Sequence, residues 1–116
     1  MSKLHDLTLV TLSYKRPAYL TRSLQYWSGR GPKIIALDGS PEPIERSALE
    51  GLACNVSYKH APVSFMKRLE MTQSMLDTPY VALLADDDFY LPSAVEASIE
   101  FLEKNSDYSA CICRPA

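Results

Sequence analysis

The stretch Tyr80-Val-Ala-Leu-Leu-Ala85 runs directly into Asp86-Asp87-Asp88, and this junction is the most informative part of the chain. Six apolar residues, preceded by Pro79 and followed by acids, are typical of a buried strand. Pro92 then predicts the start of a helix, because a missing N–H costs nothing in the first helical turn. A strand, a polar connection and a helix make one unit of an α/β sheet.

The same succession of strand and helix occurs throughout the sequence. Further strands are predicted at residues 7–12, 33–37, 55–58 and 108–112. Further helices are predicted from Pro17 to about Trp27, from Ser40 to about Leu49, and from Pro62 to about Leu76. Because the strands are apolar on both faces and alternate with helices, the sequence predicts an α/β domain with a mostly parallel sheet.

The predicted helices have recognisable inner faces. Leu20, Leu24 and Trp27 recur at helical spacing in the first helix. Ser40 is the expected N-cap of the second helix, followed by Pro41 at its first position. The expected buried stripe of the third helix is made up of Phe65, Met66, Leu69, Thr72 and Met75 or Leu76. In the last helix the residues expected to be buried are Val95, Ile99 and Leu102.

The composition limits the classes of protein that fit. The chain has 116 residues, 47% hydrophobic and 22% charged, with a net charge of −2. These values disfavour disorder and a nucleic-acid binder, and no stretch approaches the ~18 apolar residues that a membrane span needs. Three cysteines, Cys54, Cys111 and Cys113, are expected to be buried free thiols. Free thiols and the lack of an apolar leader favour a cytoplasmic protein.

The charges are unevenly distributed along the chain. Residues 1–35 contain six Lys and Arg against Asp6 alone, whereas the remainder contains six basic and 13 acidic side chains. The two parts could face each other across one site, or could form two unrelated solvated surfaces.

Several polar residues follow the predicted strands at the edge where open parallel sheets bind ligands. They are Ser13, Tyr14, Lys15 and Arg16, then Asp38, and then Asp86, Asp87 and Asp88. Three adjacent carboxylates repel one another, and a divalent cation removes this repulsion. Oxygen ligands favour Mg²⁺ or Mn²⁺. The alternative is a solvated acidic loop before the last helix.

Alternatives remain open for the other candidates. Tyr14 can stack on a nucleobase or be an exposed loop aromatic, and Arg16 can neutralise a phosphate or be solvated. Asp38 can bind a base or a ribose, or can bond its own backbone in the Asp-Gly turn. Arg68 can reach a diphosphate, or can lie on the surface and cover the flank of its helix. His60 shows no partner and is expected to be structural or exposed.

Three segments, in this order, resemble the GT-A glycosyltransferases, and most closely the inverting, sugar-nucleotide-dependent enzymes of family 2. They are Leu9-Val-Thr-Leu-Ser-Tyr-Lys-Arg16, Asp38-Gly39-Ser40 and Tyr80-Val-Ala-Leu-Leu-Ala-Asp-Asp-Asp-Phe-Tyr-Leu-Pro92. The resemblance implies a three-layer α/β/α fold in which residues 1–116 form the donor-binding half, with the catalytic base beyond Ala116. It also implies a nucleoside-diphosphate sugar as partner, with a UDP-sugar favoured.

The resemblance further implies roles for individual residues. The nucleotide-binding residues would be Ser13, Tyr14, Arg16, Asp38, Arg68 and Asp86. Asp86, Asp87 and Asp88 would hold Mn²⁺ or Mg²⁺, which stabilises the leaving nucleoside diphosphate. Since the chain differs from the family pattern at Leu12, Lys15 and Ala85, which of the three acids contacts the metal stays open.

Other function classes fit the sequence less well. A nucleotidyltransferase and a dinucleotide oxidoreductase are disfavoured because no Gly-rich motif follows the first strand. A receiver-like signalling module matches the length, but receivers resemble one another in an acidic pair after the first strand. This chain has Tyr14-Lys15-Arg16 at that place.

Overall fold

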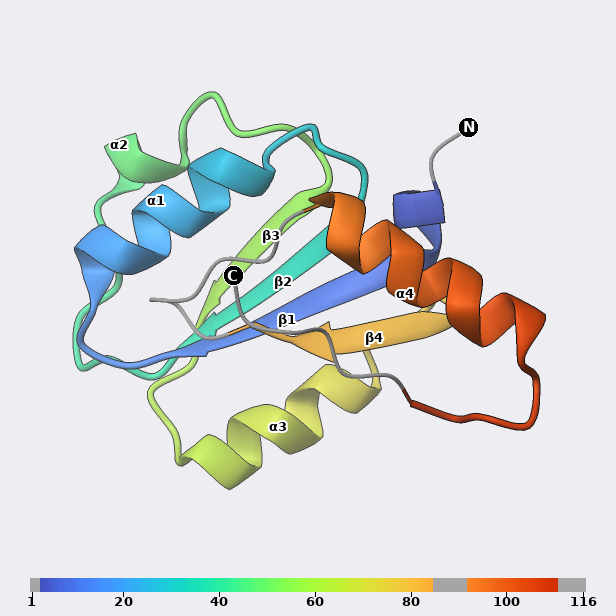
Figure 1. Cartoon of the computed structure of the whole chain (residues 1–116). Helices are drawn as coiled ribbons and strands as arrows, with labels where there is room; N and C mark the ends of the chain where they lie inside the picture. Colours follow the sequence, from blue (N-terminus) through green and yellow to red (C-terminus); the bar gives the residue numbers. More distant parts are fainter. Residues whose placement is uncertain (1–2, 85–91, 111–116) are drawn as a thin grey trace.

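The structure is a computed structural model that describes residues 3–84 and 92–110 of the chain. Strands and helices alternate in it, as the sequence predicts, and Figure 1 shows their arrangement. The elements are the short 3-10 helix η1 (Lys3–Asp6), β1 (Leu7–Ser13), α1 (Pro17–Trp27), β2 (Lys33–Asp38), α2 (Arg46–Leu49), β3 (Val56–His60), α3 (Phe65–Gln73), β4 (Tyr80–Leu83) and α4 (Pro92–Lys104).

The four described strands form one parallel sheet in the order β3-β2-β1-β4. The predicted α/β class and the parallel sheet are therefore confirmed. From β1 the chain moves outward through β2 to β3, and then returns to the other side of β1 to form β4. The strand order thus reverses between β1 and β4.

Helices lie on both faces of the sheet (Figure 1). α1, α2 and α4 cover one face, and α3 lies on the other. The main core forms beneath α1 and α4, where the predicted stripe of Leu20, Leu24 and Trp27 is fully buried. Val95 and Ile99 of α4 join the same cluster.

The predicted inner face of α3 is partly wrong. Phe65 and Met66 are 52% and 64% exposed, whereas Arg68 and Thr72 are buried. The helix begins at Phe65, and its N-cap Ser64 accepts a hydrogen bond from the Lys67 N–H at 3.2 Å. The narrow face that meets the sheet then carries positions 68 and 72, which are one helical turn apart.

β4 is shorter than the predicted strand and is not buried on both faces. Val81 and Leu83 are 52% and 56% exposed, and their register partners are Thr8 and Val10. Thr8 and Val10 are buried on the face that carries α3. α3 packs over β1, so that the same face of β4 at the end of the described sheet stays open.

The predicted helix from Ser40 to Leu49 is reduced to α2 (Arg46–Leu49), and Ser40 is not its N-cap. Pro41 and Pro43 disfavour helical conformation in the residues just before them. Ser40 also has other partners: its N–H donates to Asp38 at 3.0 Å, and its hydroxyl oxygen accepts from the Lys15 N–H at 2.6 Å.

Three further sequence-based expectations concern the cysteines, the last strand and membrane spans. Cys54 is exposed rather than buried, since it follows α2 in a surface turn; Cys111 and Cys113 lie outside the described residues. In the expected strand at 108–112, residues 108–110 are not in a strand, and 111–112 lie outside the described part. Within the described ranges, no helix has the length and apolar character that crossing a bilayer requires.

Candidate functional site

The carboxyl ends of the strands meet at one edge of the sheet. Ser13 is the register partner of Asp38, and Asp38 is the register partner of His60. These polar residues therefore end three adjacent strands in one row, on the same face. β4 runs parallel to β1, so its carboxyl end points toward this edge, and it ends beside Val10, where the Leu84 N–H donates to the Val10 carbonyl at 2.9 Å.

Asp38 lies at the buried floor of this edge and is only 2% exposed. Its Oδ1 accepts the Ser40 N–H at 3.0 Å, and its Oδ2 accepts the Tyr58 hydroxyl at 2.7 Å. The bond to Ser40 is the local backbone bond that an Asp-Gly turn offers. Both oxygens of the carboxylate are thus engaged within the protein.

Tyr58 projects from β3 and links Asp38 to the segment before α2. Its hydroxyl donates to Asp38 and accepts the Ile44 N–H at 3.1 Å. Burial, and after it the hydrogen bond to the Asp38 carboxylate, raise the pKa of Tyr58 to about 12. The phenol therefore stays a donor to Asp38 through the physiological pH range.

Ser40 connects the carboxyl ends of β1, β2 and β3. Its hydroxyl oxygen accepts the N–H of Lys15, which follows β1, at 2.6 Å. Its carbonyl oxygen lies 2.7 Å from Nε2 of His60, at the end of β3. His60, expected to be structural or exposed, therefore has a structural role, because it holds the turn after β2.

Arg68 reaches the same edge from α3 and is 4% exposed. Its Nη1 donates to the Ser13 carbonyl at 2.6 Å and lies 3.4 Å from the Leu37 carbonyl, whereas its buried Nε finds no acceptor among the described residues. Within residues 3–84 and 92–110, no carboxylate forms an ion pair with it. A buried cation without a counter-charge is costly, so this position favours an anion nearby.

The Arg68 guanidinium lies directly against Gly39. A Cβ atom at position 39 would come within 2.6 Å of the Arg68 Cζ. The Phe65 ring lies on the guanidinium as well, with its centroid 6.0 Å from Cζ. A side chain at position 39 would therefore have to displace the Arg68 guanidinium, which donates to the Ser13 carbonyl.

Next to Asp38 and Arg68, which form the buried floor of the site, three residues form an exposed rim. Tyr14, Lys15 and Arg16 follow β1 and are all exposed. The Lys15 ammonium lies 5.3 Å from the Tyr14 ring centre, and Arg16 lies 5.9 Å from that of Tyr19. Aromatic faces and cations side by side can bind a ligand that has both a flat ring and anionic groups.

The three acids predicted to bind metal, Asp86, Asp87 and Asp88, lie outside the described residues. In the sequence they begin two residues after Leu84, at the end of a strand that runs toward the same edge as Ser13 and Asp38. The described residues themselves contain no group of three His, Cys, Asp or Glu side chains that could hold a metal ion. Metal binding therefore stays a prediction for the acidic run.

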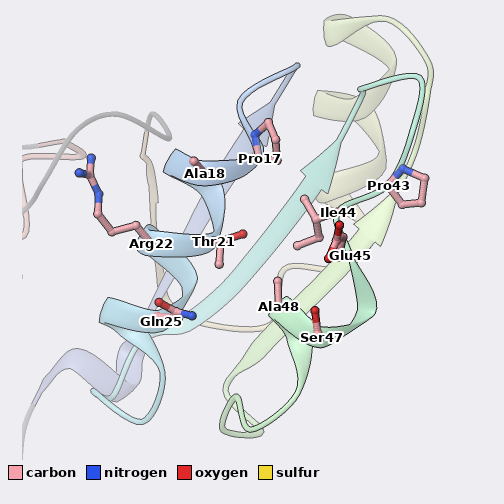
Figure 2. A pocket seen from close by; sticks show the side chains of 10 residues that line it. All are labelled: Pro17, Ala18, Thr21, Arg22, Gln25, Pro43, Ile44, Glu45, Ser47 and Ala48. Carbon is pink, nitrogen blue, oxygen red and sulfur yellow. The ribbon is translucent and has the colours of Figure 1, made fainter.

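A separate groove lies between α1 and the segment around α2, as Figure 2 shows. It has a volume of about 560 Å³, and Thr21 and Gln25 of α1 face Ile44 and Ala48 across it. Among its described lining residues only Arg22 and Glu45 are charged. The groove is thus distinct from the row of polar strand ends, although Tyr58 holds its Ile44 wall in place.

Tyr58 and Ser40 belong to the site although neither was predicted from the sequence as a site residue. Tyr58 and His60 are two residues apart, so an extended strand places both on one face. This spacing was readable in the sequence, but the register that sets His60 opposite Asp38 was not.

Comparison with known proteins assigns no family to this chain. No protein-family model matches it, and no curated protein matches it. Three features therefore define the candidate site: the buried floor of Asp38 and Arg68, the exposed rim of Tyr14 to Arg16, and the reversal of strand order beside them.

Proposed function

We propose that this chain is the donor-binding part of an inverting, family 2-like GT-A glycosyltransferase, which binds a nucleoside-diphosphate sugar with Mn²⁺ or Mg²⁺. The observation that carries the proposal is the reversal of strand order between β1 and β4. Open parallel sheets bind ligands at the carboxyl edge beside such a reversal. In this chain, residues 13–16 flank that point on one side, and the chain toward Asp86 leaves β4 on the other.

The exposed rim offers the groups that a nucleotide needs. The Tyr14 ring is accessible for stacking on a base, and Lys15 and Arg16 beside it can neutralise phosphate charge. Arg68 adds a buried positive charge at Ser13, next to them in the chain. A UDP-sugar carries a base and two phosphates, so it matches this combination of ring and cations.

The acidic run supplies the metal ligands in this proposal. Asp86, Asp87 and Asp88 offer hard oxygen donors, which suit Mn²⁺ and Mg²⁺. A metal at this place would neutralise the diphosphate as its bond to the sugar breaks.

The strand order also distinguishes this proposal from a receiver-like signalling module. Receivers have the order 2-1-3-4-5, in which the first strand lies between the second and the third. Here β1 lies between β2 and β4, and β3 lies beyond β2. This order is that of a nucleotide-binding half of the Rossmann type.

The proposal is tested by titrating UDP into the chain, with and without Mn²⁺, in a calorimeter. We expect binding that needs the metal, and a loss of affinity of about tenfold or more in the variants Asp86→Asn, Asp87→Asn or Asp88→Asn that remove a ligand. The three variants are measured separately, because the sequence leaves open which acids contact the metal.

Asp77→Asn is the matched control. It removes one carboxylate just before β4, at the opposite edge of the sheet, where Asp77 pairs with Lys33 at 3.0 Å. UDP affinity should not change in this variant. A folded wild-type chain that binds UDP no better with Mn²⁺ than without it would contradict the proposal.

A further inference from the structure

The resemblance implies a nucleotide contact for Asp38, yet the Asp38 carboxylate is closed to a ligand in this structure. It is 2% exposed, and its oxygens accept hydrogen bonds from Ser40 and Tyr58. A side chain in this state acts on a ligand through the residues that it holds.

We propose that Tyr58 is a positioning residue of the nucleotide site, and that it acts through Asp38 and Ser40 on the turn that presents Tyr14 and Arg16. Its effect on nucleotide binding rests on the proposed function. Its effect on the turn itself does not.

The first link runs from Tyr58 to Ser40. The Tyr58 hydroxyl donates to Oδ2 of Asp38 at 2.7 Å, and Oδ1 of the same carboxylate accepts the Ser40 N–H at 3.0 Å. Hydrogen bonds to a carboxylate are stronger than those between neutral groups. The orientation of the carboxylate, and with it that of Ser40, therefore depends on the phenol.

The second link runs from Ser40 to the turn after β1. The Ser40 hydroxyl oxygen accepts the Lys15 N–H at 2.6 Å. Lys15 has a φ of 54°, a left-handed conformation that is unfavourable for a residue other than glycine. This conformation needs support from outside the turn, and Ser40 provides it between Tyr14 and Arg16.

The Tyr58 hydroxyl also holds the chain segment that precedes α2. It accepts the Ile44 N–H at 3.1 Å, which fixes the segment that follows Ser40. Without the hydroxyl, one Asp38 oxygen loses its donor, and the Ile44 N–H loses its acceptor. Both ends of the segment from Asp38 to Ile44 would then be loosened together.

The test compares Tyr58→Phe with Tyr108→Phe in the full chain. Both changes remove only a hydroxyl, and Tyr108 is an exposed residue after α4 whose ring stacks on Phe101 at 5.3 Å. Two quantities are measured: the hydrogen-exchange rate of the Lys15 amide by NMR without ligand, and the affinity for UDP with Mn²⁺ by calorimetry. In Tyr58→Phe we expect roughly 3- to 10-fold faster exchange at Lys15 and a similar loss of affinity. Tyr108→Phe should change neither.

The two readouts separate the possible failures. Unchanged Lys15 exchange in folded Tyr58→Phe, or faster exchange without loss of affinity, would overturn the positioning role. If wild-type protein does not bind UDP, the proposed function fails, while the exchange rates still decide whether Tyr58 orders the turn. Should Tyr58→Phe not fold, Ser40→Ala removes the acceptor of the Lys15 N–H directly, and the same two outcomes apply to it.

Discussion

At the scale of single residues, two opposite charges, Asp38 and Arg68, are buried at one edge of the sheet without pairing with each other. Asp38 accepts hydrogen bonds from Ser40 and Tyr58, and Arg68 donates to the carbonyl of Ser13. Each charge is thus stabilised mainly by neutral groups. Substitutions that disturb these bonds should lower the stability of the protein by more than the change in side-chain size suggests, because a buried charge that loses its hydrogen bonds is not hydrated by water.

Gly39→Ala should destabilise the protein by about 1–2 kcal/mol. The new methyl group would lie 2.6 Å from the Arg68 Cζ, and a guanidinium that moves away gives up its bond to Ser13. Urea unfolding of wild type, Gly39→Ala, Arg68→Ala and the double variant measures this cost. In the Arg68→Ala background the glycine substitution should cost clearly less, and strictly additive costs would contradict the contact.

Tyr58 should make the stability of the protein sensitive to alkaline pH. Its pKa is about 12 in the folded protein and near 10 in the unfolded chain, so the folded state keeps the proton over a range where the unfolded chain loses it. The resulting stabilisation is complete below about pH 10 and is lost as the pH rises through about 12. The free energy of unfolding of wild type minus that of Tyr58→Phe should therefore be smaller at pH 11 than at pH 9. An unchanged difference would show that Tyr58 ionises alike in both states.

At the scale of elements, α3 and β4 share one face of the sheet but are buried very differently. α3 packs over β1 with Arg68 and Thr72 inward, whereas Val81 and Leu83 on the same face of β4 remain half exposed. α3 therefore contributes the buried cation of Arg68 to the strand ends, rather than an apolar stripe to the core. The packing of β4 comes mainly from the other face, where Tyr80 and Ala82 contact the core.

Val10→Ala and Val81→Ala test this difference between β1 and β4. The two valines lie on the same face of the sheet, but Val10 is fully buried and Val81 is half exposed. Val10→Ala should cost about 2–3 kcal/mol, and Val81→Ala less than about 1 kcal/mol. Chemical denaturation measures both, and equal costs would mean that β4 is covered on this face in solution.

At the scale of the whole molecule, the parallel sheet brings segments that are distant in sequence to one edge. Because every strand of the described sheet runs in the same direction, that edge brings together residues 13–16, 38–40, 58–60 and Arg68. A ligand bound at this edge would contact several segments at once. Its binding should therefore stabilise the fold as a whole.

UDP with Mn²⁺, at about 100 times its dissociation constant, should add about 2.7 kcal/mol to the free energy of unfolding. For a chain of this size the thermal midpoint should then rise by roughly 10 °C. EDTA should abolish the shift, and uridine, which lacks the diphosphate, should produce little of it. A shift that survives EDTA would exclude a metal-bridged diphosphate.

Much of the fold could be predicted because its signals are local. α1 was predicted from Pro17 and from the spacing of Leu20, Leu24 and Trp27, and β1 and β2 were predicted from short apolar runs. The signals failed where a local preference competed with a distant partner. Ser40 has the chemistry of an N-cap, but it bonds to Asp38 and Lys15 instead.

The sequence by itself determined the succession of strands and helices, and it determined which polar residues stand at the strand ends. Hydrophobic period and turn chemistry act over a few residues, so they can be read from neighbours in the chain. Only the tertiary structure decided that Ser13, Asp38 and His60 form one row, and that Tyr58 closes over Asp38. It also decided that Arg68 is buried while Phe65 and Val81 are not. Register and burial depend on which element covers which face of the sheet, and contacts between residues far apart in the chain make that choice.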